Sequence, residues 1–127
     1  MNPAAEGTVY PEITFVVDPE QVAAFREVFG QAGGVPPTFV SVAEFLVIPT
    51  VVADPILALD FSRVVHGFQE YAFERPLRDG ETLTVRTRVE SVRIKGATGF
   101  VTIETELRDT EGTLVCTARS QMIERAA

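Results

Sequence analysis

The sequence predicts an α+β fold in which a curved antiparallel sheet wraps round one central apolar helix. Three observations lead to this fold class. The first half of the chain carries two helical patterns, and the second of them, at residues 39–53, is almost wholly apolar. From residue 64 onward the pattern changes to long alternating segments separated by short turns that contain glycine. Successive strands with one apolar face need a cover, and the 39–53 helix is the best one that the chain offers.

The size and composition of the chain indicate one globular domain. Its 127 residues leave no room for two domains of ordinary size. The chain is 46% hydrophobic and 23% charged, which is too apolar for a disordered protein. We expect a flexible N-terminus over residues 1–10, which are mostly polar or small, and a single domain over residues 11–127.

Charge, hydropathy and the count of reactive residues argue against several classes of function. A net charge of −7 and a pI near 4.7 argue against nucleic-acid and membrane-surface binding. No apolar run is long enough to span a membrane and no signal peptide is visible, so we expect a soluble cytoplasmic protein. One cysteine, Cys116, and one histidine cannot form an internal disulfide or a zinc site, and we expect neither a metal nor a cofactor.

The first elements along the chain are a short strand and a helix. Residues 13–17 form a β-branched and aromatic run that predicts the strand. Asp18 can accept the first backbone N–H bonds of a helix, and Pro19 fits the first helical position, which needs no donor. Gly30 is a natural stop. Between these signals one apolar face runs at helical spacing through Val22, Phe25, Val28 and Phe29.

The central helix follows a connection of paired glycines and paired prolines at residues 31–38. Residues 39–53 carry only one charged side chain, Glu44, which predicts a helix that is buried on nearly all sides. Pro49 lies inside this segment. Because proline has no backbone N–H and its ring crowds the preceding turn, we expect it to kink or end the helix near Ile48.

Long strands are predicted at residues 64–75, 83–94 and 100–108 and from residue 114 onward. The dipeptide Asp79-Gly80 is a strong hairpin signal, and two further short turns join the later strands. We therefore expect an antiparallel meander in sequence order. A curved sheet of this kind round one buried helix is the hot-dog fold, and its edge strand is expected to pair with a second chain.

Several segments resemble a known family. Residues 35–39 (VPPTF), 65–77 (VHGFQEYAFERPL) and 80–83 (GETL) resemble the MaoC-like dehydratases, most closely the fatty-acid-synthase-I-like dehydratase subunits of actinobacteria. Residues 99–106 (GFVTIETE) fit as well. The resemblance implies the hot-dog fold and the reversible removal of water from a (3R)-3-hydroxyacyl thioester. The acyl group would be carried by coenzyme A or an acyl carrier protein, in fatty-acid or polyketide biosynthesis.

The chain departs from the catalytic members of this family. Those members carry an aspartate and a histidine on a loop of the type Gly-Asp-x-Asn-Pro-x-His, just after the first helix, and the reaction needs such groups to move two protons. Here residues 30–39 contain no aspartate, asparagine or histidine. The resemblance therefore implies a subunit that shapes the acyl tunnel in a heterodimer with a catalytic MaoC-like chain, with a homodimer as the other option.

Two residues are candidate catalytic groups if the chain acts alone. Glu44 is the only acid in the central helix, where burial would raise its pKa, and other hot-dog enzymes use a carboxylate on this helix. His66, the only histidine, could donate a hydrogen bond or a proton near the thioester. The alternative interpretations are a Glu44 that faces solvent or pairs with an arginine, and a strand histidine that is bonded at the sheet edge.

The resemblance also suggests contacts with the substrate along the path of pantetheine and beside the thioester. The paired prolines equally suit the entry to a helix, which Thr38 could cap. Cys116 alternates with inward apolar positions, which indicates core packing rather than a nucleophile. The candidate substrate-binding residues are Pro36, Pro37, Thr38, Phe39, His66 and Gly67.

Residues 63–95 hold seven basic and five acidic side chains, a net charge of +2, which leaves −9 for the rest of the chain. One interpretation is a basic face that meets the phosphate of a pantetheine arm or an acidic carrier protein. The other, which we favour, is that these side chains lie on the solvated outer faces of two strands.

Three functions stay open at this point. The chain is a subunit of a dehydratase that depends on a catalytic partner, a self-sufficient thioesterase or dehydratase that uses Glu44 and His66, or a non-catalytic module that binds acyl thioesters. The missing loop between residues 30 and 39 favours the first and the third.

Overall fold

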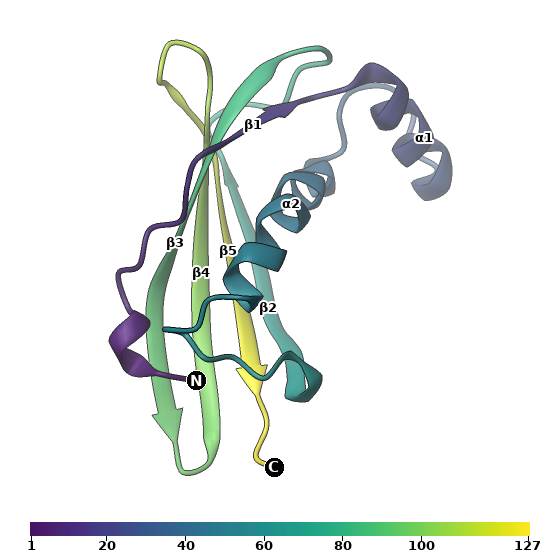
Figure 1. Cartoon of the computed structure of the whole chain (residues 1–127). Coiled ribbons are helices and arrows are strands. Elements are labelled where there is room, and N and C mark those ends of the chain that lie inside the picture. Colours follow the sequence, from purple (N-terminus) through teal and green to yellow (C-terminus); the bar gives the residue numbers. More distant parts are fainter.

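The computed structural model describes residues 1–127 and confirms the predicted α+β hot-dog fold. A five-stranded antiparallel sheet curves along one side of a central helix, and a shorter helix projects from one end (Figure 1). None of the helices combines the length and the hydropathy that crossing a bilayer requires. The elements are β1 (Ile13–Val16), α1 (Pro19–Phe29), α2 (Val40–Val52), β2 (Val64–Phe73), β3 (Thr82–Lys95), β4 (Thr98–Arg108) and β5 (Leu114–Glu124).

Helix α1 begins and ends at the residues that the sequence indicates. The carboxylate of Asp18 accepts a hydrogen bond of 3.0 Å from the backbone N–H of Glu20, and Pro19 takes the first helical position. Gly30 ends the helix with a φ of 67°, in the left-handed region where glycine is least strained. These local signals act within a few residues, which explains why the sequence locates this helix well.

The order of the strands corrects the predicted meander. The sheet runs β1-β3-β4-β5-β2, so β3, β4 and β5 follow one another as expected, but β2 pairs with β5 rather than with β3. The edge of β3 is already occupied by β1, which continues in backbone bonds from Val17 to Glu81 and from Gly80 to Val17. Gly80 does adopt a turn conformation, but this turn joins two strands that are not paired.

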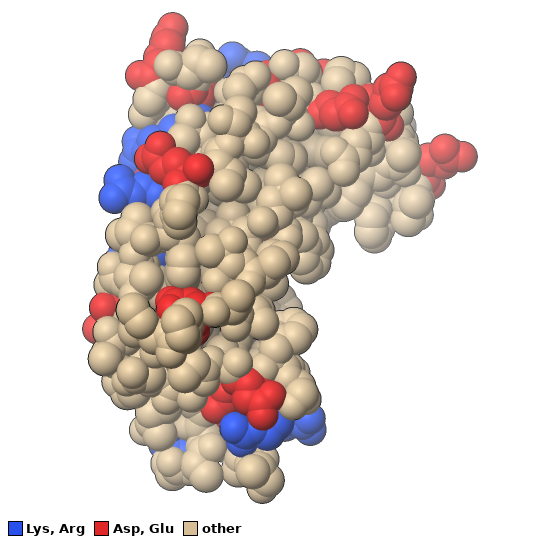
Figure 2. Space-filling view, in the orientation of Figure 1, with Lys and Arg blue, Asp and Glu red and all other residues tan.

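Helix α2 is covered on one side only. Its core side buries Val40, Ala43 and Val51 completely against the inner face of the sheet, whereas Phe45 and Leu46 are 71% and 56% exposed. The prediction of a helix buried on nearly all sides is therefore wrong for the single chain. A single sheet packs against one side of a helix and leaves the other side uncovered. Figure 2 shows few charged groups over α2, and the large side chains exposed on its open side, Phe45 and Leu46, are apolar.

Pro49 does not end the helix at Ile48. Helix α2 continues to Val52 with Pro49 inside it. Proline has no N–H, so the backbone carbonyl of Phe45, one turn earlier, loses its helical partner. Pro49 and Phe45 both lie on the exposed side of the helix, where water can bond to this carbonyl instead. The helix can therefore pass through this proline.

Residues 1–10 lie along the sheet, which differs from the flexible segment that their composition predicts. The backbone N–H of Gly7 donates to the carbonyl of Val89, and that of Tyr10 donates to the carbonyl of Thr87, each at 2.9 Å. Ala5 is fully buried, and the Tyr10 hydroxyl donates a bond of 2.8 Å to Asp54. Two buried side chains and a row of backbone bonds hold a segment whose sequence has no strong periodic pattern.

The charged side chains on the outer face of the sheet form pairs rather than a free basic surface. Arg119 on β5 contacts Glu70 on β2 at 2.9 Å and Glu90 on β3 at 2.7 Å, and Arg88 contacts Glu104 at 2.9 Å. In the register of the sheet, Glu70, Arg119, Glu104 and Arg88 face one another across four strands with alternating sign. Of the seven basic side chains in residues 63–95, three have acidic partners of this kind: Arg63, Arg75 and Arg88.

Phe39 anchors the start of α2 and provides a test of the core. It is fully buried, with its ring centroid 6.0 Å from that of Phe15 and 5.4 Å from that of Phe25. We expect Phe39→Ala to lower the free energy of unfolding by about 3–5 kcal/mol in urea titrations, because it leaves a cavity between three elements. The same change at the exposed Phe45 serves as the control and should cost less than about 0.5 kcal/mol. Similar losses for the two variants would contradict this view of the core.

Candidate functional site

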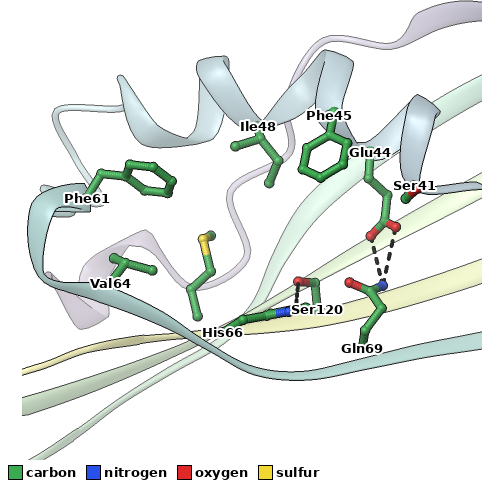
Figure 3. A pocket seen from close by; sticks show the side chains of 10 residues that line it. Ser41, Glu44, Phe45, Ile48, Phe61, Val64, His66, Gln69 and Ser120 are labelled. Atoms are coloured by element: carbon green, nitrogen blue, oxygen red, sulfur yellow. Dashed lines mark hydrogen bonds between the residues drawn. The ribbon is translucent and has the colours of Figure 1, made fainter.

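A cavity of about 310 Å³ lies between α2 and β2, where the sheet curves away from the exposed side of the helix. Its lining divides into a polar end and an apolar end (Figure 3). Five residues give the polar end: Ser41, Glu44, His66, Gln69 and Ser120. Five more give the apolar end: Phe45, Ile48, Phe61, Val64 and Met122.

The lining residues on α2 follow from helical spacing. Ser41, Glu44, Phe45 and Ile48 are separated by three or four residues, so they form one stripe along the helix. Glu44 is the only charged residue of this stripe, and it is only 9% exposed. The predicted alternative of a solvent-facing Glu44 is therefore wrong.

The lining residues on β2 depend on an irregularity in the strand. His66 pairs with Met122, and after a register shift Phe68 pairs with Gln121 and Gln69 with Ser120. This β-bulge at Gly67 reverses the alternation, so that both His66 and Gln69 face the cavity. A regular strand would have turned Gln69 away from the cavity.

Glu44 is held by two donors from β2. The Tyr71 hydroxyl donates a hydrogen bond of 2.9 Å to Oε1, and the Gln69 side-chain amide donates one of 3.0 Å to Oε2. Figure 3 shows the carboxylate reaching from the helix to Gln69 on the strand. We call this set of three side chains, Glu44, Gln69 and Tyr71, the carboxylate bridge, because it connects α2 to β2 across the groove between them.

Burial shifts the ionisation of this group. Desolvation raises the pKa of Glu44 above its ordinary value, although the hydrogen bonds from Tyr71 and Gln69 and the nearby His66 oppose the shift. Burial and the adjacent Glu44 also raise the pKa of the Tyr71 hydroxyl, which stays protonated and continues to donate. Glu44 thus has the character of a group that can exchange a proton, and both of its oxygens are bonded.

His66 and Glu44 line the same cavity but have different partners. His66 lies on the exposed strand β2, and its Nε2 is 3.1 Å from the Oγ of Ser120 on β5. Glu44 bonds to Gln69 and Tyr71 instead. The structure therefore brings the two candidate catalytic residues together without a direct hydrogen bond between them.

The other predicted site residues lie elsewhere. Phe39 and Pro36 are buried, and the side chain of Thr38 does not cap the helix, although its backbone carbonyl accepts a 2.7 Å bond from Ser41. Pro37 lines a second cavity of about 370 Å³, with Val35 and Phe73. A side chain at Gly67 would meet Gln121, since an added Cβ would lie 2.6 Å from its Oε1.

Cys116 is fully buried in the core, and burial raises the pKa of its thiol to about 12. A buried thiol that stays protonated is a poor nucleophile. The alternation of the strand indicates the same inward position in the core. The structure has no group of three or more histidine, cysteine, aspartate or glutamate side chains placed to hold a metal ion.

Three residues of the site escape analysis of the sequence: Gln69, Tyr71 and Ser120. Because of the bulge in β2 and the pairing of β2 with β5, Gln69 and Ser120 line the cavity and Tyr71 reaches Glu44. The only local signal is the HG dipeptide at the bulge, because glycine inside a strand often marks such an irregularity.

The chain matches known families over most of its length. Residues 5–118 match the family model described as "FAS1-like, dehydratase domain region". A UPF0336 protein of Streptomyces avermitilis is 44% identical over 92 residues, which are 72% of this chain and 61% of that protein. A UPF0336 protein of Clavibacter michiganensis is 31% identical over 143 aligned positions, which cover 98% of this chain and 96% of that protein. The match thus spans about 61% of the length of the first of these relatives.

Solved structures share the fold at low sequence identity. A chain of the HadBC (3R-hydroxyacyl-ACP dehydratase) complex from Mycobacterium tuberculosis superposes with a TM-score of 0.78 at 22% identity, covering 94% of this chain and 96% of that one. A MaoC-like dehydratase from Phytophthora capsici also gives 0.78, at 23% identity, covering 98% of this chain and 50% of that one. These similarities establish the hot-dog fold.

The raised pKa of Glu44 gives a pH-dependent prediction. The folded chain holds the Glu44 proton more tightly than the unfolded chain, so the contribution of Glu44 to stability should fall as the pH rises from about 4, near the ordinary glutamate value, to about 7. Glu44→Gln keeps an oxygen that accepts from Tyr71 but has no such loss. The unfolding free energy of the variant minus that of the wild type should therefore increase over this interval in urea titrations. A difference that is constant or decreases would show that Glu44 is not destabilised in its charged form.

Proposed function

This chain belongs to the FAS1-like dehydratase domain region family, and on that premise we propose that it is one subunit of a (3R)-3-hydroxyacyl-thioester dehydratase. Its role is to form a wall of the acyl site, while a partner hot-dog chain supplies the catalytic aspartate and histidine. The observation that carries this proposal is the acyl-sized cavity of about 310 Å³, which opens where α2 and β2 are uncovered.

The cavity suits the acyl part of a thioester. Phe45, Ile48, Phe61, Val64 and Met122 provide an apolar wall at one end. A ligand pocket of this type typically has a mainly apolar lining and a few polar groups that fix the orientation of the ligand. The polar groups at the other end of the cavity can take this second role.

The residues present in the cavity do not form a complete dehydration site. Dehydration needs a base for the α-proton and an acid for the leaving hydroxyl. Both oxygens of Glu44 are bonded within the chain, and the Nε2 of His66 lies beside Ser120. The connection between α1 and α2, residues 30–39, contains no acid and no histidine. This combination supports catalysis by residues of a partner chain.

Strand β2 is the natural contact for that partner. It is a ten-residue edge strand without proline or lysine, and beyond the bulge at Gly67 it runs in regular register from Phe68 to Phe73, so this part of the edge is open to pairing. Val65 on this strand is 40% exposed, and Phe45, Leu46 and Phe61 beside it are more than half exposed. A second hot-dog chain that adds a strand to β2 would also cover the open side of α2. We favour a heterodimer, because only a different chain can supply the missing catalytic loop.

The carrier of the acyl group, the pathway and the cellular location are part of the same proposal. The acyl group would be carried by an acyl carrier protein or coenzyme A, and the pathway would be fatty-acid or polyketide biosynthesis in the cytoplasm. One specific observation favours a second candidate, a self-sufficient hot-dog thioesterase or dehydratase: Glu44 and His66 do line one cavity. A module that only binds acyl thioesters is the third candidate, since the cavity itself needs no catalytic group.

The first test compares the chain alone with the chain and its partner. We expect the purified chain to give no hydration of a trans-2-enoyl-CoA above background, followed by the loss of enoyl absorbance. Co-expression with a hot-dog protein that carries the catalytic aspartate and histidine should give turnover, and His66→Ala in this chain should retain at least about a tenth of it, because His66 is not the catalytic acid or base. Turnover by the chain alone that His66→Ala or Glu44→Gln abolishes would favour the self-sufficient enzyme. Binding without turnover in either arrangement would favour the binding module.

The second test addresses the β2 contact. Val65→Lys places a charge on the exposed side of the proposed contact strand, where a docked partner would bury it. We expect it to abolish co-elution with the catalytic chain in size-exclusion chromatography and to remove the partner-dependent turnover. Ile94→Lys is the matched control, because Ile94 is also about half exposed (45%) but lies on β3, three strands away from the edge strand β2. Equal co-elution of the two variants would exclude β2 as the contact.

A further inference from the structure

We propose that the polar end of the cavity binds a hydroxyl group of the acyl chain, through the side-chain oxygen of Gln69 and a donor hydrogen of the His66–Ser120 pair. The inference rests on the proposed function, since it takes the ligand to be an acyl thioester whose tail lies at the apolar end. It makes Gln69 a residue that distinguishes hydroxyacyl from unsubstituted acyl thioesters, and it makes Glu44 a positioning residue that orients Gln69.

Glu44 fixes which end of the Gln69 amide faces the cavity. The Nε2 of Gln69 lies 3.3 Å from Oε1 and 3.0 Å from Oε2 of Glu44, so the amide nitrogen donates to this carboxylate. An ionised carboxylate only accepts hydrogen bonds, so it cannot hold the amide by its oxygen. The remaining bond of the Gln69 side chain, of 3.4 Å to the carbonyl of Arg119, also uses Nε2. The Oε1 of Gln69 is thus left as an acceptor, and Figure 3 shows it on the side of Ser120.

The pair formed by His66 and Ser120 leaves one donor hydrogen over. The Nε2 of His66 lies 3.1 Å from the Oγ of Ser120, which is the only hydrogen bond that either side chain makes within the protein. A neutral imidazole carries one N–H and a serine carries one O–H, and their mutual bond uses only one of these hydrogens. The other hydrogen has no acceptor in the protein, whichever tautomer His66 adopts. Both residues line the cavity.

The acceptor and the donor pair lie side by side on paired strands. Gln69 on β2 and Ser120 on β5 are direct partners in the sheet, which places their Cβ atoms about 5 Å apart. One ligand oxygen can bond to both groups over such a separation, because each bond is about 2.8 Å long. A hydroxyl can donate to Gln69 and accept from the His66–Ser120 pair. A thioester carbonyl only accepts, so it would leave the oxygen of Gln69 without a partner.

The place of the polar end favours a hydroxyl of the acyl chain over an amide of pantetheine, which also donates and accepts. The polar and apolar ends adjoin, because Glu44 and Phe45 are neighbours on α2, and Ser120 and Met122 are about 7 Å apart along β5. In a 3-hydroxyacyl thioester the alkyl tail begins at the carbon that bears the hydroxyl. The nearest amide of pantetheine is separated from that tail by the cysteamine carbons and the whole thioester. A hydroxyl can therefore lie at the polar end while the tail occupies the adjoining apolar end.

The test compares acyl thioesters with and without the hydroxyl. Calorimetry measures the binding of (3R)-3-hydroxyoctanoyl-CoA, octanoyl-CoA and coenzyme A to the complex of this chain with its catalytic partner. Asparagine replaces the catalytic aspartate of that partner, so that bound thioester is not turned over. We expect the hydroxyoctanoyl thioester to bind at least about tenfold more tightly than octanoyl-CoA, because the hydroxyl adds hydrogen bonds on both of its sides.

Two variants remove the Gln69 acceptor in different ways. Gln69→Met keeps the length of the side chain but has no amide. Glu44→Gln keeps Gln69 itself, but the introduced amide accepts from Tyr71 with its oxygen and offers its N–H groups to Gln69, which draws the oxygen of Gln69 away from the cavity. We expect each variant to reduce the preference for the hydroxyl at least about fivefold, while the affinity for octanoyl-CoA changes less than about twofold.

Controls separate this effect from general damage to the site. Gln121→Met is the matched control, because Gln121 lies next to Ser120 on β5 but does not line the cavity, and it should keep the preference of the wild type. His66→Ala and Ser120→Ala should each reduce the preference less than the double variant does, because each leaves one donor hydrogen in place. Thermal unfolding of each complex shows whether the variants are folded, and Glu44→Gln, which leaves Gln69 in place, decides the matter if Gln69→Met is not.

The outcomes distinguish the two proposals. If the wild-type complex binds no acyl thioester, the proposed function fails and the inference fails with it. If the wild type binds both thioesters equally, or if Gln69→Met and Glu44→Gln keep the full preference for the hydroxyl, only the further inference fails. If Gln69→Met weakens both thioesters and coenzyme A by the same factor, the polar end binds an amide of pantetheine, and the inference is likewise overturned.

Discussion

Helix α2 is almost wholly apolar, and a single five-stranded sheet covers only one of its sides. The covered side supplies the core, in which Val40, Ala43 and Val51 are fully buried. The other side leaves Phe45 and Leu46 in solvent, which is costly for a protein that acts as a monomer. The cavity, the exposed edge β2 and the proposed partner contact all lie along this uncovered side. The unequal burial of α2 therefore explains why the cavity and the proposed interface lie on the same side of the molecule.

Glu44 shows how a polar residue is accommodated under that constraint. It is the only charged residue of α2, and a buried carboxylate without partners would cost several kcal/mol. Tyr71 and Gln69 supply the partners from β2, at 2.9 and 3.0 Å. The same bonds fasten the helix to the edge strand at the polar end of the cavity. One local requirement for hydrogen bonds thus connects the two elements that line the site and sets its electrostatics.

The pairing of β2 with β5 connects the fold to the function. Because β1 occupies the edge of β3, β2 crosses to the far edge of the sheet and pairs with β5 from Val64 to Phe73. This pairing brings Ser120 beside His66 and leaves the outer side of β2 unpaired. In a meander of sequence order, β2 would pair with β3, and the side chains that line the cavity would not lie together. Residues 30–39, which contain no aspartate, asparagine or histidine, take no part in the sheet, so their sequence does not affect the pairing of the strands.

The sequence by itself determined the elements of the fold and showed that residues 30–39 contain no aspartate, asparagine or histidine. The caps of α1 at Asp18 and Gly30, the apolar helix α2 and the long alternating strands are readable because each depends on neighbours within a few residues. Only the tertiary structure decided the order of the strands, the half-covered state of α2 and the partners of Glu44. Which edge β2 joins depends on competition between distant segments. The bulge at Gly67 reverses which side chains face the helix, and no local period records that reversal. The site residues Gln69, Tyr71 and Ser120 follow from these long-range choices, whereas Glu44 and His66 stood out by their chemistry alone.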